Sequence, residues 1–77
     1  MPWKLVLRND WENSMPKVVR VLVKAVPGMT IKRATRVMWE PHTKGQALVK
    51  RCYKELAQLY EERLQIKGLT ASIEPDC

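Results

Sequence analysis

Hydrophobic and polar residues repeat with two different periods along this chain, and the change of period predicts its elements. Short apolar, β-branched runs at 3–8, 46–53 and 69–73 are bounded by turn-forming residues, which is typical of strands. In the segments 15–26, 30–40 and 55–67, apolar residues recur every three to four positions instead, which is typical of helices. The predicted order of elements is therefore β-α-α-β-α-β.

This order favours an α+β sandwich, in which the three helices cover one face of a small, mainly antiparallel three-stranded sheet. A chain of 77 residues has room for one compact domain with one small core. We therefore expect a single domain over 1–77, with its folded core at about residues 3–74. A binding site on such a small domain has to be a surface groove or a shallow pocket.

Residues with strong local preferences predict where the helices begin and end. Asn13 or Ser14 is expected to cap the first helix, and Thr30 the second. Pro41 disfavours helical geometry at Glu40, so the second helix is expected to give way there, next to His42. Glycine at position 68 is expected to stop the third helix.

The charge balance restricts the class of partner. The chain carries 14 Lys and Arg against 8 Asp and Glu, a formal net charge of +6. Clustered basic residues would indicate nucleic acid, because they release counterions from phosphates. Here they are dispersed among core positions, which favours a basic surface that faces an acidic protein. A small basic nucleic-acid-binding module remains the alternative.

Several classes of site and compartment lack support in the sequence. Two cysteines, Cys52 and Cys77, make neither a disulfide framework nor metal-ligand spacing, so we expect reduced thiols in a cytosol-like compartment. Residues 1–4 do not open a signal peptide, and the apolar runs are too short to span a membrane. With one histidine, no glycine-rich phosphate loop and no nucleophile beside a base, we expect no enzyme, cofactor or metal site.

A set of residues in fixed order resembles the ClpS family over nearly the whole chain, from Trp3 to about Ile73. The family's pattern is a strand that ends in Asn-Asp-Asp, a methionine before a helix, and Arg-Ala-Thr that leads to a methionine and a histidine. The matching residues here are Asn9, Asp10, Met15, Arg33, Ala34, Thr35, Met38, His42 and Gly45. Each short piece is a weak signal, but together in order they are a specific one.

The resemblance implies an adaptor that binds substrate proteins by a bulky hydrophobic N-terminal residue, the N-degron. It implies delivery of these substrates to a Clp AAA+ unfoldase of the ClpA or ClpC class, in the cytoplasm or in a plastid stroma. Glu55 matches a family position that faces the N-terminal domain of the unfoldase. The family's N-terminal extension is expected to be absent, because the first strand begins within a few residues of Met1.

The resemblance also implies two groups of site residues. The substrate's α-ammonium group is expected against Asn9, Asp10 and His42, with Trp11 and Glu12 nearby. The side chain of the substrate's first residue is expected in a pocket lined by Asn13, Met15, Val18, Met38, Pro41 and Leu69. Trp11 stands where the family has its second aspartate, and Pro41 where it has a small aliphatic residue. A domain that docks on the unfoldase without binding N-degrons is therefore a third hypothesis.

Overall fold

The computed structural model describes residues 2–8 and 13–76, and residues 40–44 among them by their backbone alone. The described elements confirm the predicted order of strands and helices. They are β1 (Trp3–Arg8), α1 (Met15–Ala25), α2 (Ile31–Lys44), β2 (Gln46–Cys52), α3 (Lys54–Ile66) and β3 (Ala71–Pro75).

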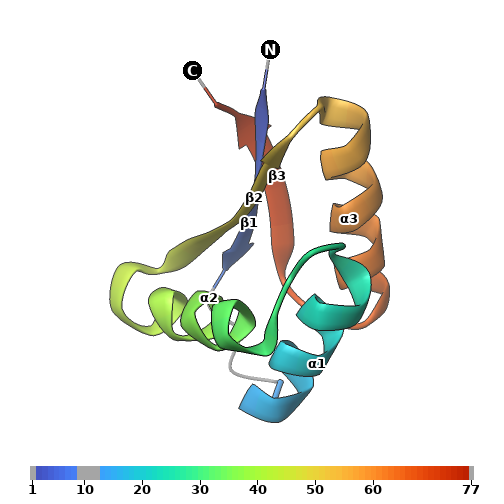
Figure 1. Cartoon of the computed structure of the whole chain (residues 1–77). Helices are drawn as coiled ribbons and strands as arrows, with labels where there is room; N and C mark the ends of the chain where they lie inside the picture. Colours follow the sequence, from blue (N-terminus) through green and yellow to red (C-terminus); the bar gives the residue numbers. More distant parts are fainter. Residues whose placement is uncertain (1, 9–12, 77) are drawn as a thin grey trace.

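The three strands form one sheet with β1 in the centre. The order is β2-β1-β3, and both strand pairs are antiparallel. Alternate residues of β1, Leu5 and Leu7, point into a core that side chains of all three helices complete. Figure 1 shows α1 and α3 together on one side of the sheet and α2 beneath β2. The predicted α+β class is confirmed.

The core is built mainly from aliphatic side chains, and every element contributes to it. Its fully buried members include Leu5, Leu22, Val26, Val49 and Leu64. Burying one such side chain stabilises the fold by roughly 1.5–3 kcal/mol. This packing holds α1, whose many valines have a low intrinsic helix propensity.

A β-bulge in β2 turns two consecutive side chains toward the helices. The register shifts between Leu5, which pairs with Lys50, and Val6, which pairs with Leu48, so Val49 has no partner on β1. Val49 is fully buried in the core. The Lys50 ammonium also reaches the helix side, where it lies 5.7 Å from the centre of the Tyr60 ring.

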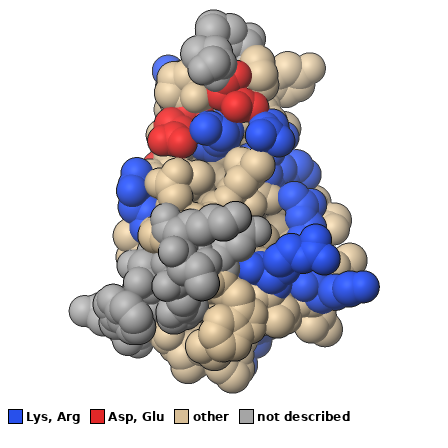
Figure 2. Space-filling view, turned by 90° about the vertical axis from the view of Figure 1, so that its left-hand side faces the viewer, with Lys and Arg blue, Asp and Glu red and all other residues tan. Residues whose placement is uncertain are grey.

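The opposite face of the sheet carries most of its charges. There Lys4 pairs with Glu74 at 3.3 Å, and Arg51 pairs with Asp76 at 2.6 Å. Figure 2 shows acidic groups gathered with basic ones toward one end of the molecule, and Lys and Arg continuing alone along the right-hand edge of the view. Basic groups are thus spread over several elements.

Two predicted helix starts are confirmed by hydrogen bonds. The Ser14 hydroxyl accepts a bond from the Lys17 amide at 3.3 Å, and the Thr30 hydroxyl accepts one from the Arg33 amide at 3.1 Å. Each bond satisfies an amide that has no partner within its helix. Gly68 follows α3 with a φ of +88°, as expected for a glycine that ends a helix.

The predicted end of the second helix is wrong. The helical backbone of α2 does not give way at Glu40 but continues to Lys44. A proline lacks the amide hydrogen that would bond to the carbonyl of Val37, yet the residues after it keep theirs and stay helical. The helix ends instead at Gly45, whose φ of +83° suits a residue without a Cβ. The backbone of His42 therefore lies inside the last turn of α2.

The last strand begins two residues later than predicted, at Ala71. The Leu69 amide donates to the Leu64 carbonyl at 3.0 Å, and the Gly68 amide donates to the Gln65 carbonyl at 2.9 Å. These bonds cap α3, so Leu69 belongs to the turn between α3 and β3. Among the described residues, no helix is long and apolar enough to cross a membrane.

Candidate functional site

The predicted pocket residues come from three places in the chain, and a side-chain hydrogen bond joins two of these. The Asn13 amide group, just before α1, donates to the Gly68 carbonyl at 2.8 Å. Gly68 immediately precedes Leu69, another predicted pocket residue. The bond therefore fixes the start of α1 against the turn between α3 and β3.

Three other predicted pocket residues pack in one buried cluster. Val18 of α1, Met38 of α2 and Leu69 of the turn are each less than a tenth exposed. All three side chains belong to the single hydrophobic core of the domain. Little of their surface is open to solvent, so a ligand could contact them only at the edge of the core.

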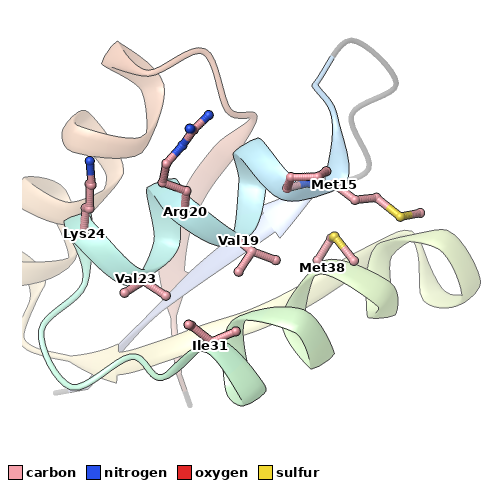
Figure 3. A pocket seen from close by; sticks show the side chains of 8 residues that line it. Met15, Val19, Arg20, Val23, Lys24, Ile31 and Met38 are labelled. Atoms are coloured by element: carbon pink, nitrogen blue, oxygen red, sulfur yellow. The ribbon is translucent and has the colours of Figure 1, made fainter.

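An open groove lies between α1 and α2, with a volume of about 510 Å³. We call it the α1–α2 groove. Its lining residues are Met15, Pro16, Val19, Arg20, Val23, Lys24, Ile31 and Met38. Of the predicted pocket residues described with their side chains, Met15 and Met38 line it, whereas Asn13, Val18 and Leu69 do not. Figure 3 shows the two methionines close to each other at one end, Val19, Val23 and Ile31 along the groove, and Arg20 and Lys24 pointing away from α2.

This groove suits an apolar side chain. Met15 is 39% exposed and so is accessible to a ligand, whereas Met38 is almost fully buried. Methionine is flexible and polarisable, which lets one wall fit aromatic or aliphatic groups of different shape. The groove therefore has the chemistry of a hydrophobic recognition site.

The sequence prediction missed the part of the groove formed by Val19, Val23 and Ile31. Val19 and Val23 follow one another at i, i+4 on α1 and form a second apolar stripe beside the core-facing one. Ile31 shares the spacing of core residues Ala34 and Met38, yet it is 69% exposed. The second apolar stripe on α1 was the available signal. A helix that buries one face needs only one apolar stripe, so a second stripe indicates a second apolar surface.

The residues expected at the ammonium group are only partly within the described chain. Asn9, Asp10, Trp11 and Glu12 lie outside the described residues, and so do the side chains of Pro41 and His42. The backbones of the last two belong to α2. The ammonium site therefore stays a prediction.

Glu55 lies in the first turn of α3, on an exposed surface. Large apolar side chains surround it in sequence, with Tyr53 72% exposed and Leu56 39% exposed. An acidic residue in a first helical turn interacts favourably with the helix dipole, so the fold alone can explain it. The exposed apolar neighbours are what a protein contact would need.

Comparison with known proteins finds the same family over nearly the whole chain. A family model described as ATP-dependent Clp protease adaptor protein ClpS matches residues 1–72. A ClpS adapter of Synechococcus elongatus is 45% identical over 74 residues, which are 96% of this chain and 78% of that one. A chloroplastic CLPS1 adapter of Arabidopsis thaliana is 40% identical over 97% of this chain, which spans about half (47%) of that protein.

A solved structure has the same fold. The structure of Agrobacterium tumefaciens ClpS2 bound to L-phenylalaninamide superposes with a TM-score of 0.87. It is 27% identical, and the match covers 97% of this chain and 96% of that one. The likeness therefore includes every described element.

Proposed function

The chain belongs to the ClpS family of ATP-dependent Clp protease adaptors, and from this premise we propose that it captures proteins by a bulky apolar N-terminal residue. It is an adaptor and not an enzyme, as the relatives' names indicate. Captured proteins pass to a Clp AAA+ unfoldase. The compartment is the cytoplasm or a plastid stroma, and two relatives are named as chloroplastic.

One observation carries the proposal. The structural relative with a TM-score of 0.87 is bound to L-phenylalaninamide, a compound with a free α-amino group and an aromatic side chain. These are the two features of a protein that begins with phenylalanine. The backbone that holds such a compound there is shared by this chain over 97% of its length.

The two features need different binding groups. An ammonium group has three donors and no acceptor, so the Asn9 amide oxygen, the Asp10 carboxylate and a neutral His42 nitrogen complement it. The apolar side chain enters between Met15 and Met38, toward the edge of the core at Val18 and Leu69. Burying it supplies roughly 2–3 kcal/mol, so the charged contacts provide much of a micromolar affinity.

We assign the unfoldase contact to the start of α3, where exposed Tyr53 and Leu56 flank Glu55. The partner is the N-terminal domain of an unfoldase of the ClpA or ClpC class. This surface is separate from the α1–α2 groove, because none of its three residues lines that groove. Cargo and unfoldase can therefore bind at the same time.

Fluorescence anisotropy with peptides that differ only in their first residue tests the proposal. Peptides that begin with Leu or Phe should bind, whereas those that begin with Val, Ile or Ser should bind much more weakly, because Met15 crowds a β-branched Cβ. The same peptides with an acetylated N-terminus should not bind. Equal binding of all free peptides, or binding of none, contradicts the proposal.

A titration with the isolated N-terminal domain of the unfoldase tests the remaining hypothesis, that the chain docks on the unfoldase without binding N-degrons. If this domain binds while none of the peptides does, the chain docks on the unfoldase without recognising N-degrons. If Glu55→Lys weakens binding of the domain but leaves the Leu-peptide affinity unchanged, the two surfaces are independent, as proposed.

A further inference from the structure

A second groove lies on the other side of α1, between α1 and α3, with a volume of about 430 Å³. We call it the α1–α3 groove. Its basic lining residues are Lys17, Arg20 and Lys24 of α1 with Arg63 and Lys67 of the α3 end, and none of the described acidic residues lines it. The α1 residues follow each other at three- and four-residue steps, so they share one face of the helix.

These cations have few partners within the fold. Among the described residues, the side chains of Lys17, Arg20, Lys24 and Lys67 form no ion pair, since the described pairs join Lys4 to Glu74 and Arg51 to Asp76. Arg63 differs, because its guanidinium donates to the Ala25 carbonyl at 3.3 Å. It ties α3 to the end of α1 and so holds the groove's shape.

Helix stability does not explain the charge at Lys17. This residue is the third after the Ser14 cap, where an acidic residue would complete a capping box and complement the helix dipole. The first turn of α1 contains no acidic residue. A cation there costs some helix stability, which a bound anionic partner would offset.

Apolar atoms lie between the cations. Val21 and Ala25 are buried beneath the groove, and Ile66 is 72% exposed at its edge. An occupant that matches both features has carboxylates next to an apolar side chain. Nucleic acid fits less well, because no aromatic side chain in the described part of the chain lines the groove for base stacking.

We propose that the α1–α3 groove binds an acidic segment of a partner protein, in which an apolar side chain contacts Ile66 and flanking carboxylates pair with the five cations. Arg20 and Lys24 line both grooves, so they form the ridge between them. The segment does not need a free N-terminus. The inference therefore does not depend on the N-degron proposal.

The test uses a fluorescent peptide of three Glu-Glu-Leu repeats, acetylated at its N-terminus so that it presents no ammonium group. Anisotropy should show saturable binding to the 77-residue chain. A Gln-Gln-Leu peptide should bind at least about tenfold more weakly, because it keeps the apolar groups but loses the charges. A Glu-Glu-Ser peptide should also lose affinity.

Matched variants locate the site. Lys67→Glu should lower the affinity for the Glu-Glu-Leu peptide by about threefold or more, and Ile66→Ser should lower it as well. Lys32→Glu, an equal charge change on an exposed α2 residue outside both grooves, should change it less than about twofold. Circular dichroism confirms that each variant is folded.

Two outcomes overturn the inference. An equal loss from Lys32→Glu and Lys67→Glu means that the peptide senses only the net charge. Tighter binding of a single-stranded oligonucleotide, weakened by Lys67→Glu, means that the groove takes nucleic acid. A Leu-starting peptide is titrated alongside, and Lys67→Glu should leave its affinity unchanged. If this peptide does not bind the parent protein, the result counts against the N-degron proposal alone.

Discussion

Met38 is at once a core residue and a wall of the α1–α2 groove, whereas Met15 belongs mainly to the groove. Met38 is 6% exposed, and Met15 is 39% exposed. Both side chains line the same open space. The two methionines therefore allow the energetics of folding and of binding to be separated.

Met15→Ala should lower the affinity for a Phe-starting peptide while changing stability little. Losing its contact with the ligand costs about 1 kcal/mol, roughly fivefold in affinity. Met38→Ala should do both, because truncating a buried methionine costs about 2–5 kcal/mol of unfolding free energy. Urea denaturation and peptide anisotropy measure the two effects. If Met15→Ala binds Phe-starting peptides as tightly as the parent protein, the Phe side chain does not bind in the α1–α2 groove.

His42→Ala should weaken Leu- or Phe-starting peptides. Removing one acceptor from a partly desolvated ammonium group costs about 1.5–3 kcal/mol, or roughly tenfold to a hundredfold in affinity. Anisotropy on the folded variant measures the loss. If the affinity stays at the parent's value, His42 has only a structural role in the last turn of α2, and the ammonium site implied by the family resemblance is wrong.

Cys52 should react slowly with alkylating agents. Burial raises the pKa of its thiol above the ordinary value, and the nearby Lys50 ammonium only partly opposes this rise in pKa. Less thiolate is therefore present at neutral pH than in an unfolded chain. In a Cys77→Ser protein, iodoacetamide should modify Cys52 faster in urea than in buffer at the same pH.

The same shift has a consequence for stability. Because the folded pKa of Cys52 is the higher one, its contribution to stability is present below the unfolded pKa, and is lost as the pH rises through the folded pKa. The unfolding free energy of Cys77→Ser should fall more steeply above about pH 9 than that of Cys52→Ala/Cys77→Ser. Equal alkaline slopes would show that this thiol is not coupled to folding.

At the scale of the elements, the turn between α3 and β3, which carries the predicted pocket residue Leu69, depends on the backbone of Gly68. Gly68 has a φ of +88°, and its carbonyl accepts the bond from Asn13. A Cβ at this position would meet Lys17 Nζ at 3.5 Å and Asn13 Oδ1 at 3.8 Å, which are ordinary contacts. Any cost of a side chain here is therefore a backbone cost.

Gly68→Ala should lower the unfolding free energy by about 1–2 kcal/mol, the cost of a left-handed conformation for an L-residue. Gly28→Ala is the matched control, because its φ is +81° and a Cβ there would meet nothing within 4 Å. The two variants should be similarly destabilised in urea, but only Gly68→Ala should weaken Phe-peptide binding, because it displaces Leu69. If both variants bind the Phe-starting peptide equally well, the turn at Gly68 is not part of the binding pocket.

Sequence alone predicted the elements well where local chemistry decides them. The β1 strand has the predicted bounds, 3–8, because turn-forming Asn9 and Asp10 follow its apolar run. The helix caps at Ser14 and Thr30 also follow from side chains that bond to nearby amides. The end of α2 does not follow from the local sequence, because Pro41 removes only one amide bond of the helix, whose backbone continues to Lys44.

The candidate site was predictable only in part. Its named residues came from a resemblance in order and spacing, and of these Met15 and Met38 line the α1–α2 groove, whereas Val18 and Leu69 are core residues that do not line it. Two features depend on how elements meet in space and leave no local signal. One is the Asn13 bond to Gly68, which joins residues 55 positions apart. The other is the bulge at Val49 and Lys50, which reflects strand pairing.

At the scale of the whole molecule, the excess of basic residues is distributed rather than focused. The α1–α3 groove holds five cations, others lie on α2 and β2, and those on the outer sheet face are partly neutralised by acids. Figure 2 shows this mixture on one side of the protein. Such a surface attracts polyanions, but its basic groups do not form one continuous face that would match the phosphates of a duplex.

Binding to duplex DNA at physiological salt should therefore be weak and insensitive to sequence. Affinity should fall steeply with added salt, because phosphate contacts through counterion release account for nearly all of it. Gel shifts with two unrelated duplexes measure this. A sequence-selective, submicromolar complex would make nucleic-acid recognition the leading function.

The central place of β1 in the sheet also determines when the protein can fold during its synthesis. Both partners of this first strand come later in the chain, and the contact between Arg8 and Ser72 joins residues 64 positions apart. The strand is made before both of its partners, and its second edge stays unpaired until residues 71–75 have followed. Closing so long a loop is slow compared with helix formation. During synthesis the sheet is therefore completed only once β3 is available, and until then one edge of the apolar β1 strand stays unpaired.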